Sequence, residues 1–180
     1  VTMKEKDLAK LRHTDFGFIF QQMHLVSNLS LLENIAVSGY LNKEKTAVQV
    51  KERTEELLAR MGITEVKTHL PSQVSGGEQQ RCAIARAVVN EPRVLFADEP
   101  TGALNRKNTT EVLGLLTDLN RDGQSIVMVT HDMRAALRAT RLLYLEDGKV
   151  IGELSLPPYD SEEEKSREIQ VNAWLSSMKW

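Results

Sequence analysis

The 180-residue sequence is poor in features that would each indicate a particular class of protein. Its single cysteine, Cys82, excludes an internal disulfide framework and favours a reducing compartment, and the small apolar neighbours of Cys82 favour a buried structural thiol. No apolar run approaches the ~18 residues that cross a bilayer, so we expect any membrane association to come through a partner. The net charge of −2 argues against a dedicated nucleic-acid-binding protein. With 41% hydrophobic residues, the chain can form one domain with a real core.

The most informative stretch begins at Val74 and reads VSGGEQQRCAIARAVVNEPRVLFADEPTGAL. Residues 75–77, Ser-Gly-Gly, read as a flexible polar turn, and residues 78–89 behind them are rich in helix formers and free of glycine and proline. Residues 94–97 form a short apolar run of the length expected for a strand buried on both faces. That strand ends on two acids, Asp98 and Glu99.

Two acids at the end of a buried strand suit a metal ion and a nucleotide. Ligands of open α/β sheets collect at the carboxyl ends of strands, so Asp98 can hold a metal ion and Glu99 can polarise a water molecule. The helix start at Gly76 and Gly77 offers unpaired N–H groups and a positive dipole end to a phosphate. Each signal alone has a simpler interpretation, as an ordinary turn or as an acid that caps the next helix. Together they predict a nucleoside triphosphate with Mg²⁺.

Two other apolar runs end on polar residues. Residues 16–20 read as a strand that ends on Gln21, and residues 126–130 read as a strand that ends on His131. Taken alone, Gln21 is most simply a solvated amide and His131 a structural histidine. A parallel sheet gathers the carboxyl ends of its strands along one edge, so we expect these two residues to lie near the two acids.

VSGGEQQR followed by VLFADEPTGAL resembles the signature motif, the Walker B strand and the catalytic glutamate of the ATP-binding-cassette (ABC) transporter ATPases. The likeness runs from about Leu11 to Gly152 and is greatest to cassettes that serve lipoprotein release, macrolide efflux and antimicrobial-peptide export. It implies an α/β fold of the P-loop NTPase (RecA-like) type, with a mostly parallel sheet and an inserted helical subdomain. It also implies one partial ATPase domain, divided into residues 1–27 with the Q-loop, 28–90 with the helical subdomain and signature, 91–156 with Walker B and the switch histidine, and 157–180 as a C-terminal helix.

The resemblance implies a role for each site residue. Glu99 would act as general base or would position the attacking water, His131 would bind the γ-phosphate, and Gln21 would contact the metal and the attacking water. Asp98 would hold Mg²⁺ with Gln21. The signature residues would bind the ATP of a second subunit in a head-to-tail dimer, and they are Ser75, Gly76, Gly77 and Glu78. The loop that communicates across this dimer would be Ala103, Leu104 and Asn105, where Asn105 replaces the usual aspartate.

The resemblance also implies partners. These are a second ATPase subunit and a transmembrane permease, through which the protein would lie at the cytoplasmic face of the membrane; the permease would choose the transported substrate. Chromosome-maintenance and DNA-repair relatives place very long coiled coils between the Q-loop and the signature. Here a short segment separates Gln21 from Ser75, which favours the transporter type over nucleic-acid-associated ATPases.

The phosphate-binding loop G-x-x-x-x-G-K-[ST], called Walker A, has no match in the sequence, whose only Gly-Lys pair is Gly148-Lys149. The family places this loop upstream of the Q-loop. We therefore expect the chain to be part of a longer polypeptide and not to bind ATP tightly alone; the alternative is a non-catalytic remnant that only pairs with a partner. Without a Walker A strand beside the Walker B strand, we expect exposed apolar edges on residues 94–97 and 126–130.

Helical periodicity predicts the remaining elements. Ser30 and Asp132 read as N-caps, and residues 43–61, 105–121 and 167–180 read as helices. Asp147-Gly148 reads as the turn of a hairpin that begins at residues 142–145. In residues 43–61 the expected buried positions are Val48, Leu57, Leu58 and Met61, and Gly62 is expected to end that helix.

Overall fold

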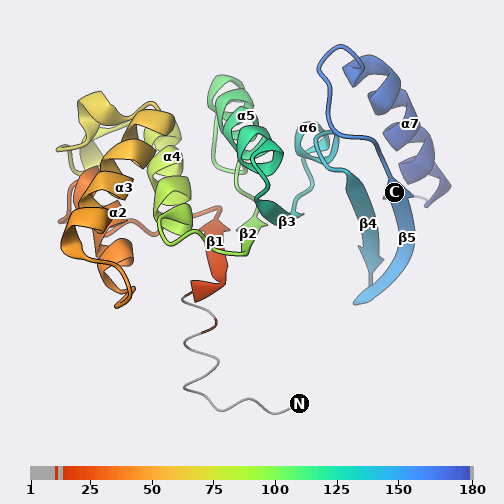
Figure 1. Ribbon diagram of the computed structural model, residues 1–180. Coiled ribbons are helices and arrows are strands. Elements are labelled where there is room, and N and C mark those ends of the chain that lie inside the picture. Colours follow the sequence, from red (N-terminus) through yellow and green to blue (C-terminus); the bar gives the residue numbers. More distant parts are fainter. Residues whose placement is uncertain (1–10, 12–13, 179–180) are drawn as a thin grey trace. The chain divides into compact units, whose positions relative to one another are not determined.

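The computed structural model describes residue 11 and residues 14–178, and its chain forms two compact units (Figure 1). Unit 1 comprises residues 1–129 and unit 2 residues 130–180. Among the described residues, no helix combines the length and apolar character that crossing a membrane requires.

Unit 1 is organised around a three-stranded parallel sheet in the order β1-β2-β3. Its strands are β1 (Phe16–Phe20), β2 (Val94–Asp98) and β3 (Ser125–Val129). The last residues of the strands, Phe20, Asp98 and Val129, lie opposite one another in register. The predicted α/β class and parallel sheet are thus confirmed, and the strand ends meet at one edge.

The sheet corrects two predictions about β2. The strand pairs with β1 on one side and β3 on the other, so residues 94–97 are not an exposed edge. Only one of its faces is buried, because Leu95 and Ala97 are inaccessible whereas Val94 and Phe96 are half-exposed. The expected free edge at residues 126–130 is confirmed for the described part of the sheet, where β3 is the outermost strand.

The second face of the sheet carries a ladder of aromatic rings. The ring of Phe96 lies 5.4 Å from that of Phe16 and 5.6 Å from that of Phe18, measured between centroids. Phe18 and Phe20 are 39% and 40% exposed, and Val127 on β3 is 51% exposed. This face therefore remains accessible in the described chain, while the opposite face packs into the core.

The core of unit 1 is built by four helices. These are α2 (Leu31–Tyr40), α3 (Ala47–Arg60), α4 (Gly76–Val88) and α5 (Arg106–Arg121), with two short 3-10 turns, η1 (Thr64–Val66) and η2 (Pro71–Gln73), between α3 and α4. Helix α4 contacts α2, α3, α5 and β1, which makes it the central helix of the unit. One continuous apolar cluster joins these helices to the covered face of the sheet.

Most predicted helix positions are confirmed, with one error in α3. Leu57, Leu58 and Met61 are buried as expected, and Gly62 has a φ of 64° at the end of the helix. Val48 is 65% exposed, so its prediction as a core residue is wrong. The buried residue of that turn is Val50, which packs where a side chain on Gly39 of α2 would have to be.

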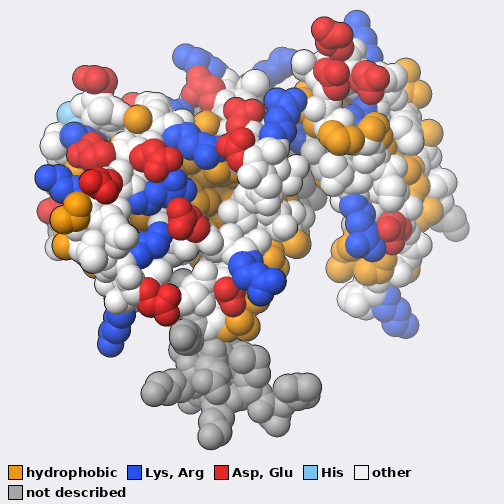
Figure 2. All heavy atoms as spheres, viewed as in Figure 1, with side chains coloured by type: hydrophobic (Ala, Val, Ile, Leu, Met, Phe, Trp, Pro, Cys, Tyr) orange, Lys and Arg blue, Asp and Glu red, His pale blue; other side chains and the backbone are white. Residues whose placement is uncertain are grey.

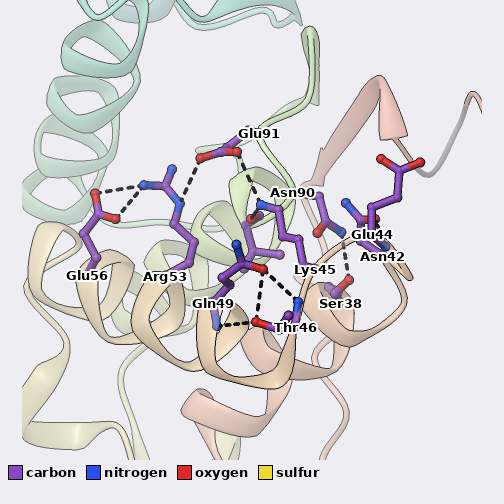
Figure 3. A network of polar contacts seen from close by, with 11 residues as sticks. Ser38, Asn42, Glu44, Lys45, Thr46, Gln49, Arg53, Glu56, Asn90 and Glu91 are labelled. Atoms are coloured by element: carbon purple, nitrogen blue, oxygen red, sulfur yellow. Dashed lines mark hydrogen bonds and ion pairs between the residues drawn. The ribbon is translucent and has the colours of Figure 1, made fainter.

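Polar side chains tie the start of α3 to the loop that follows α4 (Figure 3). The Lys45 ammonium donates to the Val89 carbonyl (3.1 Å) and pairs with Glu91 (3.3 Å). Asn90 Nδ2 donates to the Ser38 carbonyl of α2 (2.8 Å). Acidic and basic side chains alternate over the surface of these helices in Figure 2. The charges of residues 43–61 are thus a largely solvated face with local pairs.

Unit 2 contains a two-stranded antiparallel hairpin and two helices. Its elements are α6 (Met133–Ala136), β4 (Arg141–Glu146), β5 (Lys149–Ser155) and α7 (Glu164–Ser177). The predicted turn is confirmed by left-handed φ values of 47° at Asp147 and 74° at Gly148. Buried Arg167 ties α7 to the unit by donating to the carbonyls of Leu137, Pro157 and Ala139. Residues 179–180 of the predicted C-terminal helix lie outside the described residues.

Asn34 should be a strong determinant of the stability of unit 1. Its side chain is 2% exposed, accepts from the Val26 N–H (2.7 Å) and donates to three carbonyls of the loop before α2. Asn34→Leu leaves those buried groups unpaired, so we expect a loss of about 1–3 kcal/mol in the free energy of unfolding by urea. Asn42→Ala, at an exposed turn, is the control and should change stability by less than about 0.5 kcal/mol. Equal losses in both variants would contradict the role of Asn34.

Candidate functional site

The carboxyl edge of the sheet carries the two acids. Asp98 is the last residue of β2 and is exposed. Glu99 follows with a φ of 45°, and its N–H donates to the Val129 carbonyl at the end of β3 (2.9 Å). A left-handed glutamate is costly for the backbone and is held here by pairing with the neighbouring strand. The chain thus turns sharply at the point where the sheet ends and leaves both acids at this edge.

Gln21 lies beside these acids. It follows Phe20, which pairs with Asp98 in the sheet register. Its side chain packs against the turn after β2, because a Cβ built on Gly102 would lie 2.7 Å from Gln21 Nε2. That turn is closed by donation from the Gly102 N–H to the Glu99 carbonyl (3.1 Å). The structure therefore brings together Gln21, Asp98 and Glu99, as the strand pattern predicts.

The signature residues form the first turn of α4. Ser75 is the N-cap, and the helix begins at Gly76, so the predicted helix start at the two glycines is confirmed; both glycines belong to the first helical turn. The N–H and hydroxyl of Ser75 both donate to Glu78 Oε2 (2.7 Å each), and the Glu78 N–H donates back to Ser75 Oγ (3.3 Å). The hydrogen bond from the Ser75 hydroxyl is the main cause that lowers the pKa of Glu78.

The signature turn lies against the residues that follow the acidic edge. A Cβ built on Gly76 would be 3.7 Å from Leu104 Cδ2, and one built on Gly77 would be 2.5 Å from Asn108 Cγ. Asn105 caps α5, and its Oδ1 accepts from the Asn108 N–H (2.9 Å). The structure thus places the two signature glycines against Leu104, within the predicted 103–105 loop, and against Asn108 of α5. Sequence reasoning missed Asn108, since an Asn in the first turn of a helix has no distinguishing pattern.

His131 is the one predicted site residue that belongs to unit 2, and its side chain is exposed. It precedes Asp132, whose side chain accepts from the Arg134 N–H (2.9 Å) and caps α6 as predicted. The hydrogen bonds from the Arg134 guanidinium hold the pKa of Asp132 below its usual range.

Cys82 is not part of the site. It is inaccessible in α4, its Sγ lies 3.5 Å from the Leu31 carbonyl oxygen, and burial raises the pKa of its thiol to about 12. The predicted structural, unreactive thiol is therefore confirmed.

The donors at the sheet edge suit Mg²⁺. Among the described residues, no group of three or more His, Cys, Asp or Glu side chains could hold a metal ion by itself. The edge does offer the carboxylate of Asp98 and the amide oxygen of Gln21. Both are hard oxygen donors, and a magnesium ion commonly uses one or two protein oxygens together with water and phosphate oxygens. The residues present thus fit an ion that is delivered with a nucleotide.

A parallel sheet with this polar edge, packed on helices, is an α/β architecture, and the similarity to solved ATP-binding cassettes described below places it in the P-loop NTPase class. The model of the ABC transporter family matches residues 1–102, and the chain belongs to this family. The chain is similar to the macrolide export ATP-binding/permease protein MacB of Bradyrhizobium diazoefficiens, with 49% identity over 81% of the chain and 22% of the relative. MacB of Pasteurella multocida is 41% identical over 98% of the chain and 27% of the relative.

Among solved structures, the fold is similar to a dimeric ATP-binding cassette in a post-hydrolysis state bound to ADP and Pi. The TM-score is 0.76 with 37% identity, over 87% of this chain and 69% of that one. The chain thus corresponds to the nucleotide-binding domain of an ABC transporter and spans about a quarter of the length of the curated relatives named above.

The contact between Gly77 and Asn108 should decide which signature glycine tolerates a side chain. We expect Gly77→Ala to lower the free energy of unfolding by about 1–3 kcal/mol, because its Cβ would overlap the Asn108 side chain. Gly76→Ala meets only Leu104 at 3.7 Å and should be neutral or stabilising by up to about 1 kcal/mol. Adding Asn108→Ala to Gly77→Ala should recover the lost free energy of unfolding, as measured by urea denaturation. Failure of this rescue would show that the strain lies elsewhere.

Proposed function

We propose that the chain is the ATPase module of an ABC exporter, which couples ATP binding and hydrolysis in a head-to-tail dimer to extrusion of a lipid, peptide or macrolide-like molecule by a permease. The observation that carries this proposal is the meeting of Gln21, Asp98 and Glu99 at one edge of a parallel sheet. Family membership supports a nucleotide as the ligand, and the macrolide export for which the MacB relatives are named supports a role in export.

The acidic edge would perform the hydrolytic step. Glu99 would accept a proton from the water that attacks the γ-phosphorus, and its sharp backbone turn fixes the direction in which the carboxylate leaves the sheet. Asp98 and Gln21 would hold Mg²⁺, which when bound neutralises charge on the β- and γ-phosphate oxygens. Gln21 would also orient the attacking water. Two adjacent acids at the end of a strand thus allow one carboxylate, Asp98, to bind the metal and the other, Glu99, to accept the proton.

The signature turn would bind the ATP held by a second copy. Ser75, Gly76 and Gly77 offer the N-terminus of a 13-residue helix, whose unpaired N–H groups and dipole favour a phosphate. Glu78 already accepts both donors of Ser75, so a phosphate would compete with a carboxylate for the Ser75 hydroxyl. Ala103, Leu104 and Asn105 lie beside this turn and would relay dimer closure to the acidic edge, with Asn105 acting through its cap rather than through a charge.

The remaining roles follow the family pattern. His131 would bind the γ-phosphate, and the helical subdomain within residues 28–90 would receive the permease at the cytoplasmic face of the membrane. Residues 1–27 and 91–156 would then form the nucleotide-binding part, and residues 157–180 a C-terminal segment whose helix is α7. The Phe18, Phe20 and Val127 face of the sheet would be covered by further cassette structure.

Glu99→Gln tests the proposed hydrolytic role in the protein that contains this chain. Because the amide cannot accept the proton, we expect the rate of phosphate release to fall about 10²- to 10⁴-fold, with the Kd for Mg·ATP unchanged. The ATP-bound dimer should then accumulate and elute earlier in size-exclusion chromatography.

The control is Glu111→Gln, which removes an exposed carboxylate that pairs with Arg81 on the surface of α5 (2.8 Å). It should leave hydrolysis unchanged. Normal hydrolysis in Glu99→Gln would contradict the assigned base. Absence of hydrolysis in the unmodified protein, with dimerisation retained, would instead favour a non-catalytic partner subunit.

A further inference from the structure

The Gln21 segment, residues 21–26, is the first part of the loop between β1 and α2 and forms no helix or strand. His24 within it has a φ of 47°, a left-handed conformation that is uncommon for residues other than glycine. The far end of the segment is fixed by Asn34, which bonds both backbone groups of Val26. The part next to Gln21 has a different anchor.

That anchor is Arg86 of α4. Its Nη2 donates to the Met23 carbonyl and its Nη1 to the His24 carbonyl, at 2.7 Å each. A guanidinium is planar and two-pronged, so two donors from one group fix two successive carbonyls at once. The second of these belongs to the left-handed residue. Arg86 is half-buried, and both of its terminal nitrogens donate to backbone carbonyls.

The same helix also reaches the other side of Gln21. Gln80 is fully buried, and its Nε2 donates to the carbonyl of Phe20, the residue before Gln21, through a longer contact of 3.4 Å. Its neighbour Gln79 points instead to the carbonyl of Pro71, ahead of the signature turn (2.9 Å). Side chains of α4 therefore bracket Gln21, while the N-terminus of α4 is the signature turn.

We infer that Arg86 is a positioning residue for Gln21: by holding the carbonyls of Met23 and His24, it fixes the backbone that directs the Gln21 side chain toward the turn after β2. The consequence for hydrolysis rests on the proposed function, whereas the positioning itself does not.

Backbone ¹⁵N relaxation of Arg86→Met tests the positioning. Methionine keeps the apolar stem but removes both donors. We expect order parameters at residues 22–24 to fall from about 0.85 to below about 0.6, with α4 and β1 unchanged. Arg81→Met on the same helix is the control, because the Arg81 guanidinium donates to the Glu111 carboxylate (2.8 Å) and not to the Gln21 segment. Unchanged order at residues 22–24 would overturn the inference, as would an equal loss throughout unit 1.

Arg86→Lys covers the case in which Arg86→Met does not fold. Lysine keeps the charge but offers a point donor in place of the fork. We expect order parameters at residues 22–24 between those of the unmodified chain and 0.6, with the core unaffected. Order parameters in Arg86→Lys identical to those of the unmodified chain would show that the two-pronged guanidinium is not required.

Steady-state kinetics of the protein that contains this chain give a second readout. A displaced Gln21 should lower kcat about 10- to 100-fold in Arg86→Met while the KM for ATP stays unchanged, and Arg86→Lys should recover part of kcat. A rise in KM alone would contradict positioning of a group that acts on the attacking water. If the unmodified protein does not hydrolyse ATP, the proposed function fails, and the relaxation experiment still decides the role of Arg86.

Discussion

In-register pairing of three parallel strands is the constraint on which the site of unit 1 depends. Because Phe20, Asp98 and Val129 end their strands opposite one another, residues distant in sequence must emerge at one edge. If β1 or β3 slipped by one residue against β2, its last residue would no longer lie opposite Asp98, and each of its side chains would move to the other face of the sheet. The apolar face that packs on α4 and α5 opposes such a slip, because Ile19, Leu95 and Ala97 would lose their burial.

Helix α4 is the second organising element. It contacts three helices and a strand, starts with the signature turn and donates side chains to the residues around Gln21. Its packing explains why residue 77 is a glycine, since Asn108 of α5 fills the space where a Gly77 side chain would be. The features proposed to bind a neighbouring subunit's nucleotide and those proposed to act on the chain's own nucleotide are therefore connected through a single packed helix.

The sequence predicted the elements well where periodicity and caps were unambiguous. The strand at residues 16–20, the caps at Ser30 and Asp132 and the hairpin turn at Asp147 are all found. Strand order could not be predicted, because apolar runs show where strands end but not which strands are neighbours. Val48 and Val50 are both apolar positions of one charged helix, and the choice of Val50 depends on its fit against Gly39 in α2. Arg86 and Asn108 were missed because their partners are backbone or glycine, which leave no pattern in the sequence.

If the edge at Asp98 binds a metal-bound nucleotide, as proposed, Mn²⁺·ATP should broaden the NMR signals of nearby residues in the protein that contains this chain, with Mn²⁺ in place of Mg²⁺. We expect the signals of Gln21, Glu99 and Gly102 to broaden, and Asp98→Asn to remove the effect. Equal broadening in Asp98→Asn, or broadening that leaves these three residues untouched, would contradict the proposal.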